Sequence, residues 1–334
     1  MLFRSIISFG PRPDDFLACN APIKCLYDLG IAIEENSELD LLASFKKHID
    51  DPRIPSKIEE MKKELSKNNP YEGILPRLSQ YELTLEDWMK EHQGVKKYVA
   101  FANKCWPAFQ TEFGFVPCYI NSRLTSRGIP IACEVDIYGA LSEYIGECIS
   151  GKITTLLDIN NTVPRSMYES KIQGKYDYDL EETFMGFHCG NTASCLLVNP
   201  HMGYQRIMKR DLEPDRKEPD ITRGTMEGNI KPGEITLFRL QSTADSHLEA
   251  YCAQGEILPN DCESFGTIGT FAIKDMARFY RYVLLEKHFP HHGAVMFGHY
   301  GKSFYEVMRY LNITDISYNR PSNIPYPTEN PYKD

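Results

Sequence analysis

Residues 133–159 constrain the fold more than any other part of this sequence. Over 133–150 the apolar residues recur every three or four positions, which is typical of a helix with one buried face. Gly151 ends this helix, and residues 153–159 then form a nearly continuous apolar run with Asp158 near its end. Such a run predicts a buried strand. A helix followed at once by a buried strand is expected in an α/β protein.

The rest of the first half of the chain also alternates short apolar runs with helical patterns. Ser37 with Asp40, and Thr84 with Asp87, have the spacing of a capping box, in which an acid three residues into a helix pairs with its first residue. They predict helices that begin at Ser37 and at Thr84 and end near residues 48 and 109. Further elements are expected as helices over 14–29 and 55–67 and strands over 6–9 and 30–33.

The second half is richer in strand patterns. Residues 200–232 are polar and rich in Pro, Gly and charge, which predicts a long excursion of the chain. We place a domain boundary at the end of the predicted helix, with an α/β domain over 1–152 and a β-rich domain over 153–334. The elements expected in the second domain, after the strand over 153–159, are strands over 235–240, 247–253, 263–271 and 294–297 and helices over 274–287 and 302–311.

Composition excludes several classes of protein. The chain has 334 residues, of which 42% are apolar and 25% charged, so it is not a disordered protein. Its formal net charge of −9 argues against broad binding to nucleic acid or to an anionic membrane, because both require a basic surface. No stretch approaches the roughly 18 apolar residues of a membrane span.

Ten cysteines are scattered along the chain without a CxxC pair. This spacing argues against a zinc ribbon or a thioredoxin-type site. Several cysteines lie within apolar runs, where a thiol behaves as a small hydrophobic group. Reduced thiols in a cytoplasmic protein are therefore the expectation. The sequence also lacks GxGxxG after a strand, GxxxxGK[ST], GxSxG and HExxH, which argues against the corresponding nucleotide-binding, hydrolase and zinc-protease sites.

Two carboxylates, Glu134 and Asp158, are expected to meet at one end of the predicted helix and strand. Glu134 is placed in the first turn of a helix of about 16 residues, or ~24 Å. The strand returns by about six residues, or ~20 Å, so that Asp158 comes back level with Glu134 if the two elements pack antiparallel. The helix N-terminus would favour the ionised form of Glu134. Two close anions need a compensating cation, most simply a divalent metal.

Three histidines, His188 and the pair His291 and His292, are candidates for the same site. The pair precedes a predicted strand, and ligands are often placed at such an edge. An imidazole beside two carboxylates forms a mixed nitrogen and oxygen site that suits Mn²⁺. Each residue also has an ordinary structural interpretation: a helix-end acid, a strand-end acid or a half-buried, hydrogen-bonded ring.

Several short segments carry a resemblance to a known family. These segments are Gly10-Pro11-Arg12-Pro13 with Asp15-Phe16, Lys104-Cys105-Trp106-Pro107, Pro117-Cys118, residues 128–136, Leu157-Asp158-Ile159-Asn160-Asn161, Phe187-His188-Cys189-Gly190-Asn191, residues 233–240 and Pro290-His291-His292-Gly293-Ala294-Val295. Their order and spacing, which hold across nearly the whole chain, resemble those of the L-fucose isomerase and L-arabinose isomerase family.

The resemblance implies a Rossmann-like α/β domain, similar to the second domain of the family, followed by a barrel-like α+β domain. It implies that Glu134, Asp158 and His292 bind Mn²⁺ or a similar divalent metal, with His292 favoured over His291. The two carboxylates, Glu134 and Asp158, would also be the catalytic acid and base. The substrate site would include His188, Asn191 and His291.

The family interconverts an aldose and a ketose through a metal-stabilised ene-diol or ene-diolate, so the expected function is an aldose–ketose isomerase or its catalytic part. Family members usually carry a further α/β domain ahead of the part seen here, which is apparently missing. The alternatives are a non-catalytic sugar-binding or assembly protein with the same fold and, less favoured, a metal-dependent hydrolase. The resemblance further implies a cytoplasmic homo-oligomer, a trimer or hexamer, that acts on a monosaccharide. The sequence leaves open which sugar is bound, which metal, and which carboxylate moves which proton.

Overall fold

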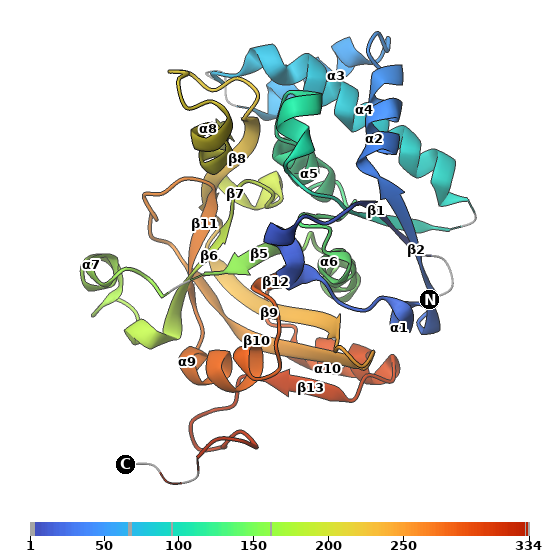
Figure 1. Ribbon diagram of the computed structural model, residues 1–334. Coiled ribbons are helices and arrows are strands. Elements are labelled where there is room, and N and C mark those ends of the chain that lie inside the picture. Colours follow the sequence, from blue (N-terminus) through green and yellow to red (C-terminus); the bar gives the residue numbers. More distant parts are fainter. Residues whose placement is uncertain (1–3, 66–68, 95, 161, 331, 333–334) are drawn as a thin grey trace.

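The computed structural model describes residues 4–65, 69–94, 96–160, 162–330 and 332, and it contains two β-sheets with helices packed around them (Figure 1). The expectation of a mixed α/β protein is therefore confirmed. The first sheet is built from residues 4–132 and the second from residues 155–318.

The first sheet has four parallel strands in the order β2-β1-β3-β4. Both strands predicted in this part of the chain, over 6–9 and 30–33, are found here. The bounds are β1 Arg4–Gly10, β2 Ile31–Ser37, β3 Tyr98–Ala102 and β4 Ile131–Ala132.

The helices of the first half include one capping box predicted correctly and one predicted wrongly. At the start of α2 the Ser37 hydroxyl accepts from the Asp40 amide at 3.2 Å, and the Asp40 carboxylate accepts from the Ser37 amide. Thr84 instead lies inside α4, where its hydroxyl donates to the Gln80 carbonyl at 2.8 Å. The helices are α1 Lys24–Asp28, α2 Glu38–Lys47, α3 Ile54–Glu64, α4 Leu75–Gln93, α5 Cys118–Thr125 and α6 Ile137–Ser150, with single turns at Asp14–Cys19, Glu72–Ile74 and Phe109–Phe113. The helix expected over 14–29 is thus two short pieces, and the one expected over 84–109 ends at Gln93.

Helix α6 joins the two sheets. Ile137 and Leu141 share one apolar cluster with Ile6 of the first sheet and Phe238 of the second. The helix packs closely on the second sheet at Gly146, where a Cβ atom would lie 2.6 Å from the Thr154 hydroxyl. Figure 1 shows α6 near the centre of the molecule, between the two sheets.

The second sheet has nine strands in the order β13-β10-β9-β12-β5-β6-β11-β8-β7. Because β10 also pairs with β11, the pairings of β10, β9, β12, β5, β6 and β11 form a closed ring. The bounds are β5 Thr155–Ile159, β6 Thr183–His188, β7 Leu197–Tyr204, β8 Arg223–Ile230, β9 Gly233–Ser242, β10 Leu248–Leu258, β11 Thr267–Ala272, β12 His292–Phe297 and β13 Asp315–Tyr318.

The long polar segment 200–232 is more ordered than its composition predicts. It contains most of β7, all of β8 and the helix α8, and β7 pairs with β8 in an antiparallel hairpin. Its polar residues are compatible with strands because β7 lies at the edge of the sheet. The helices of this half are α7 Arg165–Met167, α8 Arg206–Leu212, α9 Met276–Phe279 and α10 Gly301–Tyr310, with turns at Tyr168–Ile172, Leu180–Glu182, Ser194–Leu196 and Tyr280–Leu285.

Candidate metal and active site

The register of two central strands brings Asp158 and His292 together. Strands β5 and β12 are antiparallel, and Asp158 lies directly opposite His292 in their ladder. Consecutive residues of a strand point to opposite faces, so directly opposed residues share a face. The Nε2 atom of His292 consequently lies 3.2 Å from Oδ1 of Asp158. His292 is fully buried, whereas the Asp158 side chain retains 25% of its exposure.

Glu134 reaches the same point from a turn and not, as predicted, from the first turn of a helix. Helix α6 begins at Ile137, and Asp136 is its N-cap, with the Asp136 carboxylate accepting from the Gly139 amide at 2.8 Å. Glu134 and Val135 precede the helix with φ angles of 63° and 52°. This left-handed conformation is uncommon for residues other than glycine.

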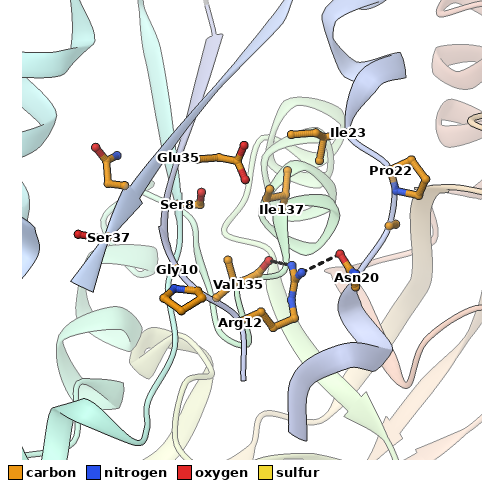
Figure 2. A pocket seen from close by; sticks show the side chains of 13 residues that line it. Ser8, Gly10, Arg12, Asn20, Pro22, Ile23, Glu35, Ser37, Val135 and Ile137 are labelled. Carbon is orange, nitrogen blue, oxygen red and sulfur yellow. Dashed lines mark hydrogen bonds between the residues drawn. The ribbon is translucent and has the colours of Figure 1, made fainter. Parts of the chain in front are cut away.

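Arg12 holds this left-handed turn in place. Its guanidinium donates to the carbonyl of Glu134 at 3.0 Å and to the carbonyl of Val135, and it also donates to the Asn20 side chain at 2.9 Å (Figure 2). One side chain therefore satisfies both carbonyls of the turn. The strained backbone that presents the Glu134 carboxylate is supported by these bonds.

The Glu134 carboxylate completes the cluster. Its Oε2 atom lies 3.7 Å from Nε2 of His292 and 3.5 Å from Nε2 of His291. His291 Nε2 also lies 3.9 Å from Oδ1 of Asp158. The two predicted carboxylates and the two neighbouring imidazoles thus converge on one point, although helix α6 and strands β5 to β11 lie between Glu134 and His292 in the sequence.

Asp136 and Arg239 fix the orientation of the His292 ring through its Nδ1 atom. The Asp136 carboxylate lies 2.8 Å from Nδ1 of His292, and it accepts two hydrogen bonds from Arg239 at 2.8 and 2.9 Å. A carboxylate only accepts, so Nδ1 carries the proton and Nε2 faces Glu134 and Asp158. This arrangement is typical of a histidine that binds a metal. Sequence reasoning assigned these two residues no role, although a charged Arg239 between Phe238 and Leu240 in an apolar strand signals a buried partner.

Burial and charge shift the pKa values of this network. Burial would raise the pKa of Asp136, but Arg239 and His292 outweigh it and hold the pKa well below its usual range. Burial would likewise lower the pKa of His292, but its interactions with Cys19, Asp136 and Asp158 outweigh burial and raise this pKa well above its ordinary value. The pKa of Asp158 is lowered, because the neighbouring histidines outweigh its burial. The network therefore favours the ionised forms of Asp136 and Asp158.

The donor set fits a divalent metal. Nε2 of His292 and Oδ1 of Asp158 are buried and form no hydrogen bond within the described part of the chain, which is costly unless another group binds them. Cys19, Glu134, His291 and His292 also place one ligand atom each within 4.8 Å of one another. Carboxylate oxygens with an imidazole nitrogen suit Mn²⁺ or a similar ion.

His188 lies beside this cluster, whereas the side chain of Asn191 forms its hydrogen bond with β4. The rings of His188 and His292 are 5.9 Å apart, and a ligand atom of His188 lies within 4.8 Å of those of Asp158 and His292. Burial would lower the pKa of His188, but Cys189 and Asp158 raise it to about 9. The Asn191 amide donates to the Ile131 carbonyl at 2.8 Å, and its side-chain oxygen is buried without a hydrogen bond to any residue that the structure describes. Substrate contact by these residues and by the half-exposed His291 stays a prediction.

A cavity of about 600 Å³ is lined by the chain neighbours of two cluster residues, Val135 next to Glu134 and Asn20 next to Cys19. Figure 2 shows Arg12 spanning from Val135 to Asn20 at one end of this cavity. Its other walls come from the carboxyl ends of β1 and β2, with polar side chains such as Ser8 and Glu35. Ligands of parallel sheets commonly bind at this end of the strands.

Within the described residues, the structure has no helix that is both long and apolar enough to cross a membrane. This finding agrees with the lack of a long apolar run in the sequence.

Comparison with known proteins gives a family match for the second half of the chain. Residues 186–318 match the model described as "L-fucose isomerase, C-terminal domain". The matched segment contains His188, Asn191, His291 and His292, and it begins after Asp158.

Curated relatives extend the similarity over most of the chain. This chain is 25% identical over 289 residues to a sulfoquinovose isomerase from Priestia aryabhattai. The aligned region covers 85% of this chain and 57% of the relative. The chain is 27% identical to the sulfoquinovose isomerase of Alkalicoccus urumqiensis, with coverage of 82% and 56%, and 32% identical over 169 residues to that of Clostridium sp. (strain MSTE9), with coverage of 50% and 32%. The resemblance to the L-fucose isomerase family is thus confirmed, and the chain spans little more than half the length of the first two relatives.

Proposed function

We propose that this relative of L-fucose isomerase and sulfoquinovose isomerase is a divalent-metal-dependent aldose–ketose isomerase, or the catalytic part of one. The observation that carries the proposal is the convergence of Glu134, Asp158 and His292, with a buried imidazole nitrogen and a buried carboxylate oxygen that form no hydrogen bond with any described residue. The names of the relatives support the same class of reaction.

Glu134, Asp158 and His292 would hold the metal, with Mn²⁺ the expected ion. When bound, such an ion polarises the sugar carbonyl and stabilises the negative charge of an ene-diolate. Asp136 and Arg239 would keep His292 oriented, so that Nε2 stays directed at the two carboxylates.

The same two carboxylates would move the protons. One takes the proton from C2 of the aldose and returns it to C1, and the other transfers the O2 hydroxyl proton to O1, so no proton is gained or lost overall. The Glu134 and Asp158 side chains retain 16% and 25% of their exposure, which leaves each an open face toward a substrate. Which carboxylate carries which proton is open in this proposal.

The substrate would be a monosaccharide. The relatives' name makes sulfoquinovose a candidate, and the family name makes L-fucose another. The test is ketose formation from sulfoquinovose, L-fucose, L-arabinose and D-arabinose by the full chain with added Mn²⁺. Turnover of one sugar that disappears on chelation supports the proposal.

Absence of both turnover and Mn²⁺ binding would refute the isomerase proposal. Sugar binding that survives Glu134→Gln unchanged, without turnover, would instead favour a non-catalytic sugar-binding protein.

The finer architecture is part of the same proposal. The parallel order β2-β1-β3-β4 supports a Rossmann-like domain over 1–152, and the closed ring of pairings supports a barrel-like domain over 153–334. A cytoplasmic homo-oligomer, trimeric or hexameric, remains a proposal from family resemblance. Sedimentation of the purified chain tests the oligomeric state.

A further inference from the structure

Three thiols that are far apart in the sequence converge close to the candidate active site. Cys105 follows β3, Cys118 is the first residue of α5, and Cys189 directly follows β6. Their sulfur atoms lie within 4.8 Å of one another. Cys105 and Cys118 are buried, Cys189 is half-buried, and all three are free thiols. The absence of a CxxC motif therefore does not prevent a thiol cluster, because the fold brings the residues together.

A fourth donor is next to this cluster. His188 precedes Cys189, is 2% exposed, and forms no hydrogen bond through either ring nitrogen within the described residues. A buried imidazole normally has a partner for at least one nitrogen, so this ring is available to a ligand. His188 adjoins Cys189 in the sequence, and its ring also places a ligand atom within 4.8 Å of those of Asp158 and His292.

We propose that Cys105, Cys118 and Cys189 form a second metal site, for Zn²⁺, with His188, the residue before Cys189, as the fourth donor. Three thiolates and one imidazole are a common tetrahedral ligand set for structural zinc. Thiolates select zinc over Mn²⁺, which prefers oxygen ligands, so the two neighbouring sites would take different metals. The site ties together the segments after β3, at α5 and after β6, and it does not depend on the proposed isomerase activity.

A purely apolar role is the competing explanation. Cys105 and Cys118 do pack in a small apolar cluster with Phe16 and Val116. Apolar packing gives no reason, however, for a buried histidine next to these thiols that forms no hydrogen bond in the described part of the chain.

The test is a Co²⁺ titration of the reduced, metal-free full chain, with Mn²⁺ present to occupy the carboxylate site. We expect one Co²⁺ per chain to produce a thiolate-to-cobalt charge-transfer absorption that Zn²⁺ abolishes and excess Mn²⁺ does not. Cys118→Ser and Cys189→Ser should each weaken Co²⁺ binding at least tenfold. Cys252→Ser, which changes another buried cysteine, should leave the absorption unchanged.

Two further measurements test the zinc site even if a cysteine variant folds poorly. Zn²⁺ should raise the melting temperature of the unaltered chain, because a ligand that binds only the folded state stabilises it. Glu134→Gln should retain the charge-transfer absorption even though it impairs the carboxylate site. No charge-transfer absorption in the unaltered chain, or an equal absorption in Cys118→Ser and Cys189→Ser, would overturn the zinc proposal and leave the isomerase proposal untouched.

Discussion

The carboxylate cluster and the thiol cluster are neighbours that differ in almost every physical respect. The carboxylate cluster is partly exposed, and its buried histidine is held by the Asp136–Arg239 ion pair. The thiol cluster is mostly buried, and its neighbours include the apolar side chains Phe16 and Val116. Each cluster has a histidine from the end of a strand next to its ligands: His292, the first residue of β12, belongs to the carboxylate cluster, and His188, the last residue of β6, adjoins Cys189.

This difference indicates that the carboxylate cluster suits a catalytic role and the thiol cluster a structural one. Exposed carboxylates can change protonation state and meet a substrate, whereas buried thiolates around a metal hold segments of chain together. Changes confined to one cluster should therefore leave metal binding at the other cluster unchanged. The predictions below test this independence.

The largest effect is expected from Glu134→Gln. This change keeps the shape of the side chain but removes its charge and its capacity as a base, so isomerase activity should fall by about 10²–10⁴-fold. The measurement is the rate of ketose formation at saturating Mn²⁺. Glu256→Gln is the matched control, since Glu256 is a half-buried acid outside both clusters. Equal activity of the two variants would contradict the assigned role of Glu134.

Asp136→Asn should weaken both Mn²⁺ binding and the fold. Loss of a group that orients a ligand typically lowers metal affinity 10–100-fold, and breaking a buried ion pair costs about 3–5 kcal/mol. Because the pKa of Asp136 is lowered in the folded chain, its contribution is present above the ordinary carboxyl pKa of about 4 and is lost as the pH falls. Mn²⁺ titration and denaturant unfolding at pH 7 measure the two effects. Unchanged affinity in a folded variant would show that Asp136 has no orienting role.

Glu147→Gln tests a half-buried acid that belongs to neither cluster. Burial raises the pKa of Glu147 to about 7, so in the original chain its stabilising contribution is present at low pH and is lost as the pH rises through about 7. The variant removes this loss. The melting temperature of the variant minus that of the original chain should therefore be more positive at pH 8 than at pH 5. The same difference at both pH values would contradict the shifted pKa.

The smallest effect is expected from Cys118→Ser on the carboxylate cluster. The affinity for Mn²⁺ should stay within about twofold of the original, because Cys118 contributes no ligand to that site. A large loss in a variant with an unchanged circular dichroism spectrum would show that the two clusters act as one.

The sequence predicts the carboxylate cluster better than its surroundings. Helix and strand lengths place Glu134 level with Asp158, and the family resemblance adds His292. The left-handed turn at Glu134 was missed because it depends on hydrogen bonds from the distant Arg12. The thiol cluster was missed because Cys105, Cys118 and Cys189 meet only through tertiary packing.

The helices and strands were likewise predicted correctly where the signal is local and missed where it depends on distant residues. Ser37 and Asp40 form the predicted capping box because both residues needed for it lie within one turn. Thr84 has the same spacing, but α4 has already begun at Leu75, with a proline in its first turn, so Thr84 lies in the interior. Strands β7 and β8 were not predicted, because their polar residues are tolerated only through pairing at the edge of the sheet.

Anomalous scattering from crystals of the full chain soaked in Mn²⁺ tests the central claim most directly. The account predicts a manganese peak bounded by Nε2 of His292 and the carboxylates of Glu134 and Asp158, and loss of that peak in Glu134→Gln crystals. A peak only at the thiols, or no peak at the carboxylate cluster in well-ordered crystals, would contradict it.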